Sequence, residues 1–224
     1  MCGRYALRTS VPELARTLGV EALVDLVPRY NIAPTQPVPA MHTAGGRRTL
    51  RWMRWGLVPS WSAGPDTRYA MHNARIENIT SKPAYREPVR NKRCLLPVSG
   101  WYEWQNLKGR KQPWLIVHGE EPVICLAGVW DHWQRDGESI TSCSILTTDA
   151  LAPISHIHKR MPIVVPEQRW DAWLNPANHN AHAALEVLQP AATSALRPIA
   201  VSAHVNNARN DDPLCMSGLQ VTEK

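Results

Sequence analysis

Cys2 is the residue whose position most directly suggests chemistry, because it follows the initiator Met1 in the opening MCGRYA. Removal of Met1 would leave a free α-amine and a thiol on one residue. The pKa is about 8.5 for a thiol and about 8 for an α-amine, so both nucleophiles are partly available near neutral pH. The amine can condense with an aldehyde, and the neighbouring thiol can then close a five-membered thiazolidine ring. The alternative is that Cys2 is a small buried core residue.

Asn73 and Arg75 form the second candidate group, in the segment HNARIEN. The two residues are two positions apart, so they point to the same face if the chain is extended there. An amide at position 73 can hold an amine in place, and the guanidinium at position 75 can bind a phosphate. The alternative for this segment is an ordinary polar loop.

Glu103 lies between aromatic residues in the segment GWYEWQ. In an alternating strand it would share a face with Trp101 and Gln105. Apolar surroundings raise the pKa of a carboxyl group, which suits a group that moves protons. The alternative is an exposed glutamate on a strand.

His156 and His158 alternate in the segment ISHIHKRMP and are followed by Lys159 and Arg160. Two histidines on one face could bind a metal, but no other group of ligands has suitable spacing. A histidine that acts as a general acid beside a cationic phosphate site fits the segment better. We therefore expect neither a metal nor an organic cofactor.

The charge of the sequence is unevenly distributed. Residues 1–111 contain 18 Lys and Arg against 7 Asp and Glu, whereas residues 112–224 contain 7 against 12. A basic half suggests a surface for a polyanion, because Lys and Arg that neutralise phosphates release counterions. The 10 Trp residues could supply platforms for bases, since stacking is worth about 1–3 kcal/mol per base. The alternative is a basic solvated surface with the Trp residues in the core.

The composition favours a globular protein in a reducing compartment. The hydrophobic fraction of 44% is sufficient for a core. No apolar run is long enough to span a membrane. The N-terminus lacks the basic stretch followed by an apolar region that a secretory signal has. The five cysteines form no C-x-x-C pair, which favours buried thiols over disulfides or a zinc framework. We expect a cytoplasmic, nucleoid-associated or nuclear protein that is not secreted.

The helices are expected to be few and short. Residues 9–19 predict the first helix, in which Ser10 and Glu13 have the spacing of a capping box and Gly19 can end the helix. Residues 29–40 contain three prolines and predict an extended or looped chain. Further helices are expected over residues 82–86, 166–174 and 178–189.

The expected strands are more numerous than the helices. Residues 49–61 predict a strand that runs into a turn at Pro59, and residues 196–202 predict a last strand. This mixture predicts a single α+β domain over residues 1–224, with a mostly antiparallel, barrel-like β core, peripheral helices and a tail from about residue 210. The remaining strand candidates are Cys94–Val98, Trp101–Gln105, Trp114–His118, Val123–Trp130, Ile140–Thr147 and Met161–Val165.

The motifs, taken together and in order, resemble the SOS response-associated peptidase (SRAP) family of abasic-site processing proteins. The matching segments extend over almost the whole chain, and each of them alone would be weak. They are MCGRYA, RYNIAPTQ, RWGLVPSW, NARIEN, CLLPVSGWYEWQ, QPWLIV, LAGVWD, ILTTDA, IHKRMPIVV and PIAVSAHVNNARND.

The resemblance implies that Cys2, once Met1 is removed, captures the aldehyde of an abasic site in single-stranded DNA as a thiazolidine cross-link. It implies that Asn73 places the amine, that Glu103 moves protons and that His158 protonates the sugar ring oxygen. DNA-contacting positions are then expected at Arg4, Pro34, Trp61, Arg75, Thr147, Lys159 and Arg160. Ser62 stands where relatives can carry a second aromatic residue, which implies a narrower wedge beside Trp61.

Two other classes of function stay open from the sequence. The first is a thiol peptidase, acting on itself or on other proteins through an N-terminal cysteine. The second is a module that binds single-stranded DNA reversibly without catalysis. A weak lyase activity through the same imine is compatible with the cross-linking hypothesis. A DNA-bound monomer is the simplest assembly, and replication-fork proteins are the candidate partners.

Overall fold

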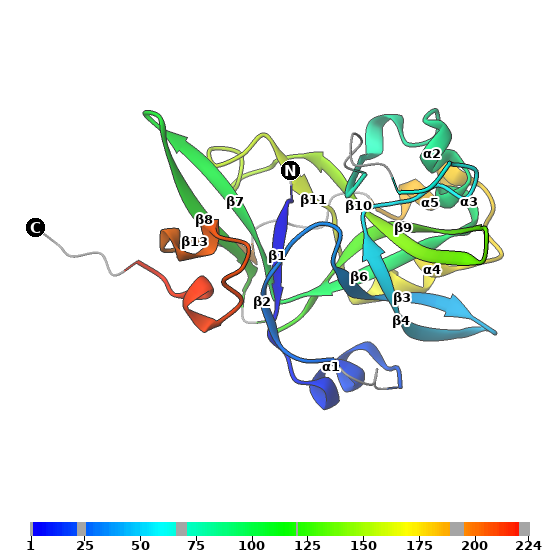
Figure 1. Cartoon of the computed structure of the whole chain (residues 1–224), viewed down its shortest axis with the longest axis horizontal. Helices are drawn as coiled ribbons and strands as arrows, with labels where there is room; N and C mark the ends of the chain where they lie inside the picture. Colours follow the sequence, from blue (N-terminus) through cyan, green and yellow to red (C-terminus); the bar gives the residue numbers. More distant parts are fainter. Residues whose placement is uncertain (1, 22–25, 66–70, 120, 189–194, 220–224) are drawn as a thin grey trace, which may run out of the picture.

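The chain folds around a closed five-stranded barrel, seen at the right of the molecule in Figure 1. The computed structural model describes residues 2–21, 26–65, 71–119, 121–188 and 195–219. Strand β10 pairs with both β4 and β9, which closes the ring β10–β4–β3–β6–β9. The barrel is mixed, because β4 and β10 run parallel while the other pairs are antiparallel. Its strands are β3 (Pro37–Ala44), β4 (Arg47–Trp55), β6 (Arg93–Val98), β9 (Ile124–Arg135) and β10 (Glu138–Asp149).

Every residue of strand β6 (Arg93–Val98) is buried, so this strand of the barrel has side chains packed against it on both faces. Large aromatic side chains such as Trp55 are fully buried in the core, where each buries a large apolar area. Gly128 lets β9 approach its neighbours closely, since a Cβ there would lie 2.5 Å from Leu96 Cδ1 and 2.9 Å from Cys94 Sγ. A side chain at this position would overpack the wall of the barrel.

A second sheet of five strands crosses the molecule beside the barrel, with the order β13–β8–β7–β1–β2 (Figure 1). Strand β1 pairs antiparallel with β7 and with β2, so the start of the chain lies in the middle of this sheet. The strands are β1 (Arg4–Leu7), β2 (Arg29–Ile32), β7 (Gly100–Leu107), β8 (Arg110–His118) and β13 (Leu196–Ala200).

The helices are short and lie outside the two sheets. Helix α1 (Val11–Leu18) ends at Gly19, which adopts the left-handed conformation, but the Ser10 side chain makes no capping hydrogen bond. Helix α4 (Trp170–Leu174) packs on β6 through buried Trp173, whose Nε1 donates to the carbonyl of Cys94 at 2.9 Å. The other helices are α2 (Pro83–Arg86), α3 (Pro88–Asn91), α5 (Ala181–Glu186) and the 3₁₀ turns η1 (Ile76–Asn78), η2 (Glu167–Arg169), η4 (Ala203–Asn206) and η5 (Pro213–Met216).

Three short strands extend the barrel wall: β5 (Asn73–Arg75), β11 (Arg160–Pro162) and β12 (Val164–Val165). Strands β5 and β11 both pair with β10. Two segments far apart in the sequence, HNAR and HKRMP, are therefore brought to the same strand. Among the described residues, no helix has the length and apolar character that a membrane crossing requires.

The structure confirms the expected α+β fold with a barrel-like core and peripheral helices. All the expected strands between residues 94 and 165 form, although the last divides into β11 and β12. Residues 29–40, which the prolines marked as extended or looped, contribute β2 and the start of β3. The described part of the expected tail, residues 210–219, contains η5 and the fully buried Cys215.

Candidate active site

Cys2 lies just before β1 and is fully buried. Its thiol donates a weak hydrogen bond to the carbonyl of Arg4, with a separation of 3.9 Å. Burial raises the pKa of the Cys2 thiol well above its ordinary value, and the nearby carboxylate of Glu103 raises it further. The thiol is therefore neutral at pH 7, and its use as a nucleophile requires a base that takes its proton.

Asn73 faces Cys2 from strand β5. Its Nδ2 donates to the Cys2 carbonyl at 2.8 Å. The parallel pairing of Asn73 with Ile145 on β10 fixes the backbone at this point, and the hydroxyl of Tyr85 donates to the Asn73 carbonyl at 3.3 Å. The Asn73 Oδ1 is buried and has no hydrogen-bond partner among the described residues. An acceptor of this kind can receive a donor that arrives with the substrate or with the processed terminus.

Glu103 occupies β7, one residue beyond Tyr102, which pairs with Arg4 on β1. Only 2% of Glu103 is exposed. Burial raises the pKa of its carboxyl group to about 7, because a charged carboxylate loses hydration in these surroundings. Both protonation states are consequently populated near neutral pH, so Glu103 can give a proton in one step and take one in another.

His158 lies in the loop before β11 and reaches Glu103. Its Nδ1 is 3.8 Å from Glu103 Oε2 and 3.0 Å from both the backbone nitrogen and the carbonyl oxygen of Arg160. Burial lowers the pKa of His158, so the ring is mostly neutral at pH 7. Gln105 Nε2 donates to the carbonyl of His156 at 3.0 Å and so fixes the same loop to β7.

The four residues expected to act on a carbonyl thus converge from four separate segments of the chain. Cys2 contacts Asn73 directly, the charge of Glu103 acts on Cys2, and His158 is the neighbour of Glu103. A nucleophile, an amide, a carboxyl group near its pKa and a neutral imidazole together provide what imine formation and ring closure require.

The residues expected to contact DNA fall into two groups. The first group has exposed or partly exposed side chains. Trp61 is 66% exposed and lies over a pocket of about 310 Å³ against α2 and α3. Arg4 is partly buried, with its guanidinium 5.8 Å from the centre of the Trp104 ring. Arg75 and Lys159 are exposed, and Pro34 is partly exposed.

Arg160 and Thr147 form the second group, in which the terminal guanidinium nitrogens of Arg160 and the hydroxyl of Thr147 are bound within the protein. The Arg160 side chain is 13% exposed, and its Nη1 pairs with carboxylates of Glu77 and Asp149, at 2.6 Å each. Its Nη2 also donates to the carbonyl of Thr147 at 2.7 Å. The Thr147 hydroxyl is buried and donates to the carbonyl of Ala74 at 3.3 Å. This group joins β5, β10 and β11 and so sets the position of the His158 loop.

Three supporting residues were not singled out from the sequence: Tyr85, Gln105 and Asn31. Asn31 is fully buried, and its Oδ1 accepts from Arg4 Nη1 at 2.8 Å. Each of these contacts joins positions far apart in the chain, so no spacing in the sequence could have indicated them. The one available signal was that Asn31 lies within the motif RYNIAPTQ.

The chain is similar to known proteins over most of its length. The abasic site processing protein YoqW of Bacillus subtilis is 31% identical over 218 residues, which cover 95% of this chain and 97% of YoqW. The abasic site processing protein HMCES of Gallus gallus is 31% identical over 87% of this chain and 67% of its own length. A crystal structure of a protein from Bacteroides thetaiotaomicron superimposes with a TM-score of 0.86 at 26% identity, covering 97% of this chain and all of that one.

Residues 1–208 match the profile of the family described as SOS response associated peptidase (SRAP). The match covers the barrel, the second sheet and every residue of the candidate site. The chain therefore belongs to the SRAP family.

Proposed function

We propose that this protein captures abasic sites in single-stranded DNA covalently, through a thiazolidine formed by the amine and thiol of Cys2. The observation that supports this most strongly is the contact of Asn73 with Cys2, beside the carboxyl group of Glu103. The names of the relatives YoqW and HMCES, which are abasic site processing proteins, support the same class of substrate. Capture requires that Met1 has been removed.

The first step opens the closed sugar of the abasic site. His158 gives its Nε2 proton to the ring oxygen as the bond from that oxygen to C1 breaks. Protonated Glu103 supplies a proton to Nδ1 across the 3.8 Å gap between them, which closes by a small movement, so the imidazole stays neutral. The hydroxyl proton on C1 is released to solvent, and C1 becomes an aldehyde. This relay uses a neutral histidine and a carboxyl group whose pKa is about 7.

The second step joins Cys2 to C1. The α-amine attacks the aldehyde, and the carbinolamine loses one water to form an imine. The thiol then adds across the C=N bond, with sulfur bound to carbon and the thiol proton passed through the Glu103 carboxylate to nitrogen. The buried Asn73 Oδ1 accepts a hydrogen bond from the amine and keeps it beside the aldehyde. The net change is the loss of one water, with no oxidant or reductant.

The surrounding residues hold the DNA strand. Arg75 and Lys159, whose side chains are exposed, contact phosphates. Arg4 is partly buried and its Nη1 is bound by Asn31 and Val205, so it contacts a phosphate through its other guanidinium nitrogens. Trp61 and Pro34 provide apolar surface for bases. Ser62 Oγ donates to the carbonyl of Pro59 at 2.8 Å and stays inside its own turn, so Trp61 acts as a single wedge. Arg160 and Thr147 support the DNA path by fixing β5, β10 and the His158 loop.

The proposal is tested by mixing the protein with single-stranded DNA in which a uracil has been converted to an abasic site. Denaturing gels should show a heat-resistant adduct with the wild type. Cys2→Ser should give only an imine that is lost without reduction, because serine leaves the amine but no thiol. A chain with one residue inserted between Met1 and Cys2 is the matched control, since it keeps the thiol but not its α-amine. A stable adduct with either variant would show that the thiazolidine proposal is wrong.

A further inference from the structure

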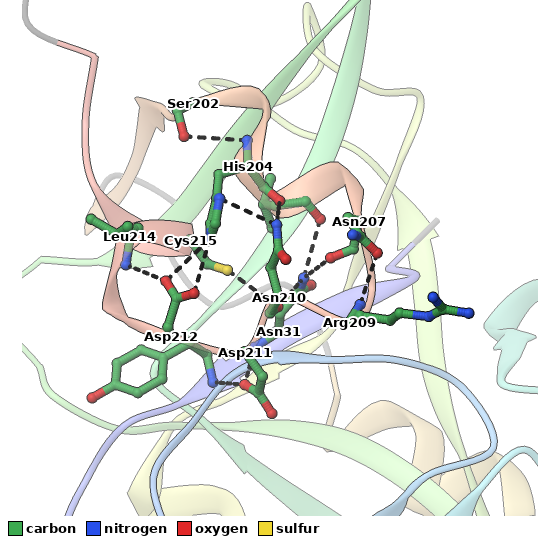
Figure 2. A network of polar contacts seen from close by, with 12 residues as sticks. Asn31, Ser202, His204, Asn207, Arg209, Asn210, Asp211, Asp212, Leu214 and Cys215 are labelled. Carbon is green, nitrogen blue, oxygen red and sulfur yellow. Dashed lines mark hydrogen bonds and ion pairs between the residues drawn. The ribbon is translucent and has the colours of Figure 1, made fainter.

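A group of possible metal ligands lies outside the candidate active site, in the segment that follows β13. Figure 2 shows His204, Asp212 and Cys215 facing one another in this segment. One ligand atom of each residue lies within 4.8 Å of the other two. His204 belongs to η4, Asp212 precedes η5 and Cys215 lies within it. The residues combine an imidazole nitrogen, a carboxylate oxygen and a thiol sulfur.

The accessibility of the three side chains suits an ion that enters from solvent. The side chains of His204 and Asp212 are 32% and 43% exposed, whereas Cys215 is fully buried beneath them. His204 Nε2 already lies 2.9 Å from Asp212 Oδ2. A tetrahedral ion with bonds of about 2.0–2.3 Å holds its ligand atoms roughly 3.3–3.6 Å apart. Side-chain shifts on the order of 1 Å would therefore bring the three donors to that geometry.

The backbone of this segment is fixed independently of any ion. Asn31 Nδ2 donates to the carbonyls of Val205, Asn207 and Asn210, at 3.2, 3.1 and 2.8 Å (Figure 2). The Asp211 carboxylate accepts from the backbone nitrogens of residues 30 and 31. The stretch between His204 and Asp212 is thus attached to β2. A fixed backbone lowers the ordering cost of binding.

We propose that His204 Nε2, an Asp212 carboxylate oxygen and the Cys215 sulfur bind a divalent cation of the zinc class, with water in the fourth position. Nitrogen, oxygen and sulfur donors in a tetrahedral set are those that Zn²⁺ takes in proteins. The thiol proton is released on binding, and the ring proton of His204 moves from Nε2 to Nδ1. Asn210 Nδ2 lies 3.2 Å from Nδ1 and donates to the His204 carbonyl at 2.8 Å. When Nδ1 carries the proton, the Asn210 amide must rotate away from the ring and give up its contact with Nδ1.

The test is a titration of the full-length chain with Co²⁺, which substitutes for Zn²⁺ and gives a thiolate-to-metal absorption band. The starting protein carries Cys2→Ser, because an N-terminal aminothiol is itself a chelator. We expect the band to appear in this protein, to be lost on addition of Zn²⁺, and to be absent when Cys215→Ser is added. Zn²⁺ should also raise the melting temperature of the starting protein.

A second pair of variants keeps the test decisive if Cys215→Ser does not fold. His204→Gln changes a partly exposed side chain and should weaken Co²⁺ binding by at least about tenfold. His182→Gln, at an exposed position on α5, is the control and should bind as the starting protein does. The proposal is overturned if the starting protein shows no band, if the band survives Cys215→Ser, or if both histidine variants bind equally. None of these readouts depends on DNA cross-linking.

Discussion

At the scale of single residues, the proposed reaction depends on what burial does to three titratable groups. Burial keeps the thiol of Cys2 and the ring of His158 neutral, and it raises the pKa of Glu103 to about 7. The sequence predicted this behaviour of Glu103 from its aromatic neighbours. It could not predict that the Cys2 thiol would be fully buried, because that depends on strands from distant parts of the chain.

The pH dependence of cross-linking is expected to follow the carboxyl group of Glu103. The rate should rise towards pH 7, as the protonated amine loses a proton and the carboxyl group of Glu103 begins to form its carboxylate, and fall above it, as the acid form of Glu103 disappears. Glu103→Gln should lower the rate about 100-fold or more and remove the decline on the alkaline side. Glu138→Gln, at an exposed position on β10, is the control. Single-turnover rates of adduct formation across pH measure both effects, and an unchanged profile in Glu103→Gln would contradict the assignment.

Glu103 should also make the folded state less stable as the pH rises. Its folded-state pKa of about 7 lies above the ordinary value of 4.5, so between these values the folded chain holds a proton that the unfolded chain has lost. Stability therefore falls as pH rises from 4.5 to 7, and the loss is complete above 7. Glu103→Gln should be more stable than the wild type at pH 8, by on the order of 3 kcal/mol, with the difference vanishing at pH 4. Urea unfolding at pH 8 and at pH 4 measures this difference in the free energy of unfolding. Equal free energies of unfolding for the wild type and Glu103→Gln at pH 8 would show that the folded state does not hold Glu103 as a buried carboxylate.

At the scale of elements, two short strands that the sequence did not indicate assemble the candidate site. Strand β1 has four residues and β5 has three, too few for an alternating pattern to stand out. The longer strands of the barrel were predictable because their apolar runs are longer. Asn73 and Arg75 do lie in an extended segment, as the same-face argument required. The pairing of β5 with β10 and of β1 with β7 is tertiary, so the sequence could name candidate residues but not place them.

The attachment of the C-terminal segment to β1 and β2 should depend on Asn31. Asn31→Ala removes the donor to three carbonyls and the acceptor of Arg4. Arg4 Nη1 keeps its hydrogen bond to the Val205 carbonyl at 3.0 Å, but the loss of the other hydrogen bonds at this fully buried position should lower the free energy of unfolding by about 3 kcal/mol. Asn207→Ala is the control. Among the described residues its exposed side chain accepts a hydrogen bond from the backbone of Arg209 alone, so the substitution should cost about 1 kcal/mol or less. Similar losses in the two variants, measured by denaturant unfolding, would contradict this role of Asn31.

At the scale of the whole molecule, the first half of the chain carries an excess of positive charge and also supplies the nucleophile. Residues 1–111 have 11 more basic than acidic side chains, and this half includes Cys2, Asn73 and Glu103. In Figure 1, β1 leads from the start of the chain to α1 at the opposite side of the molecule. The basic residues therefore cover more than one face, and only those near the start of β1 are expected to bind the DNA strand.

Reversible binding to undamaged single-stranded DNA should distinguish basic residues near the candidate site from basic residues elsewhere on the surface. Arg75→Ala, next to the candidate site, should weaken binding and reduce the slope of log K against log salt by about 0.7, the contribution of one phosphate contact. Arg16→Ala, at an exposed position on α1, should leave the slope unchanged. Fluorescence anisotropy over a range of salt concentrations gives both slopes. The same decrease in the two variants would point to a diffuse electrostatic interaction instead of a defined path.

The bond between the protein and the abasic site tests the central claim most directly. Mass spectrometry of the cross-linked complex, after digestion of the protein and the DNA, identifies the residue that carries the adduct and gives the mass of the adduct. We predict an adduct on the peptide that begins with Cys2, without Met1, at the mass of the two components less one water, and unchanged by borohydride. An adduct on a lysine, an adduct on a chain that keeps Met1, or one whose mass increases on reduction would contradict capture by the Cys2 aminothiol.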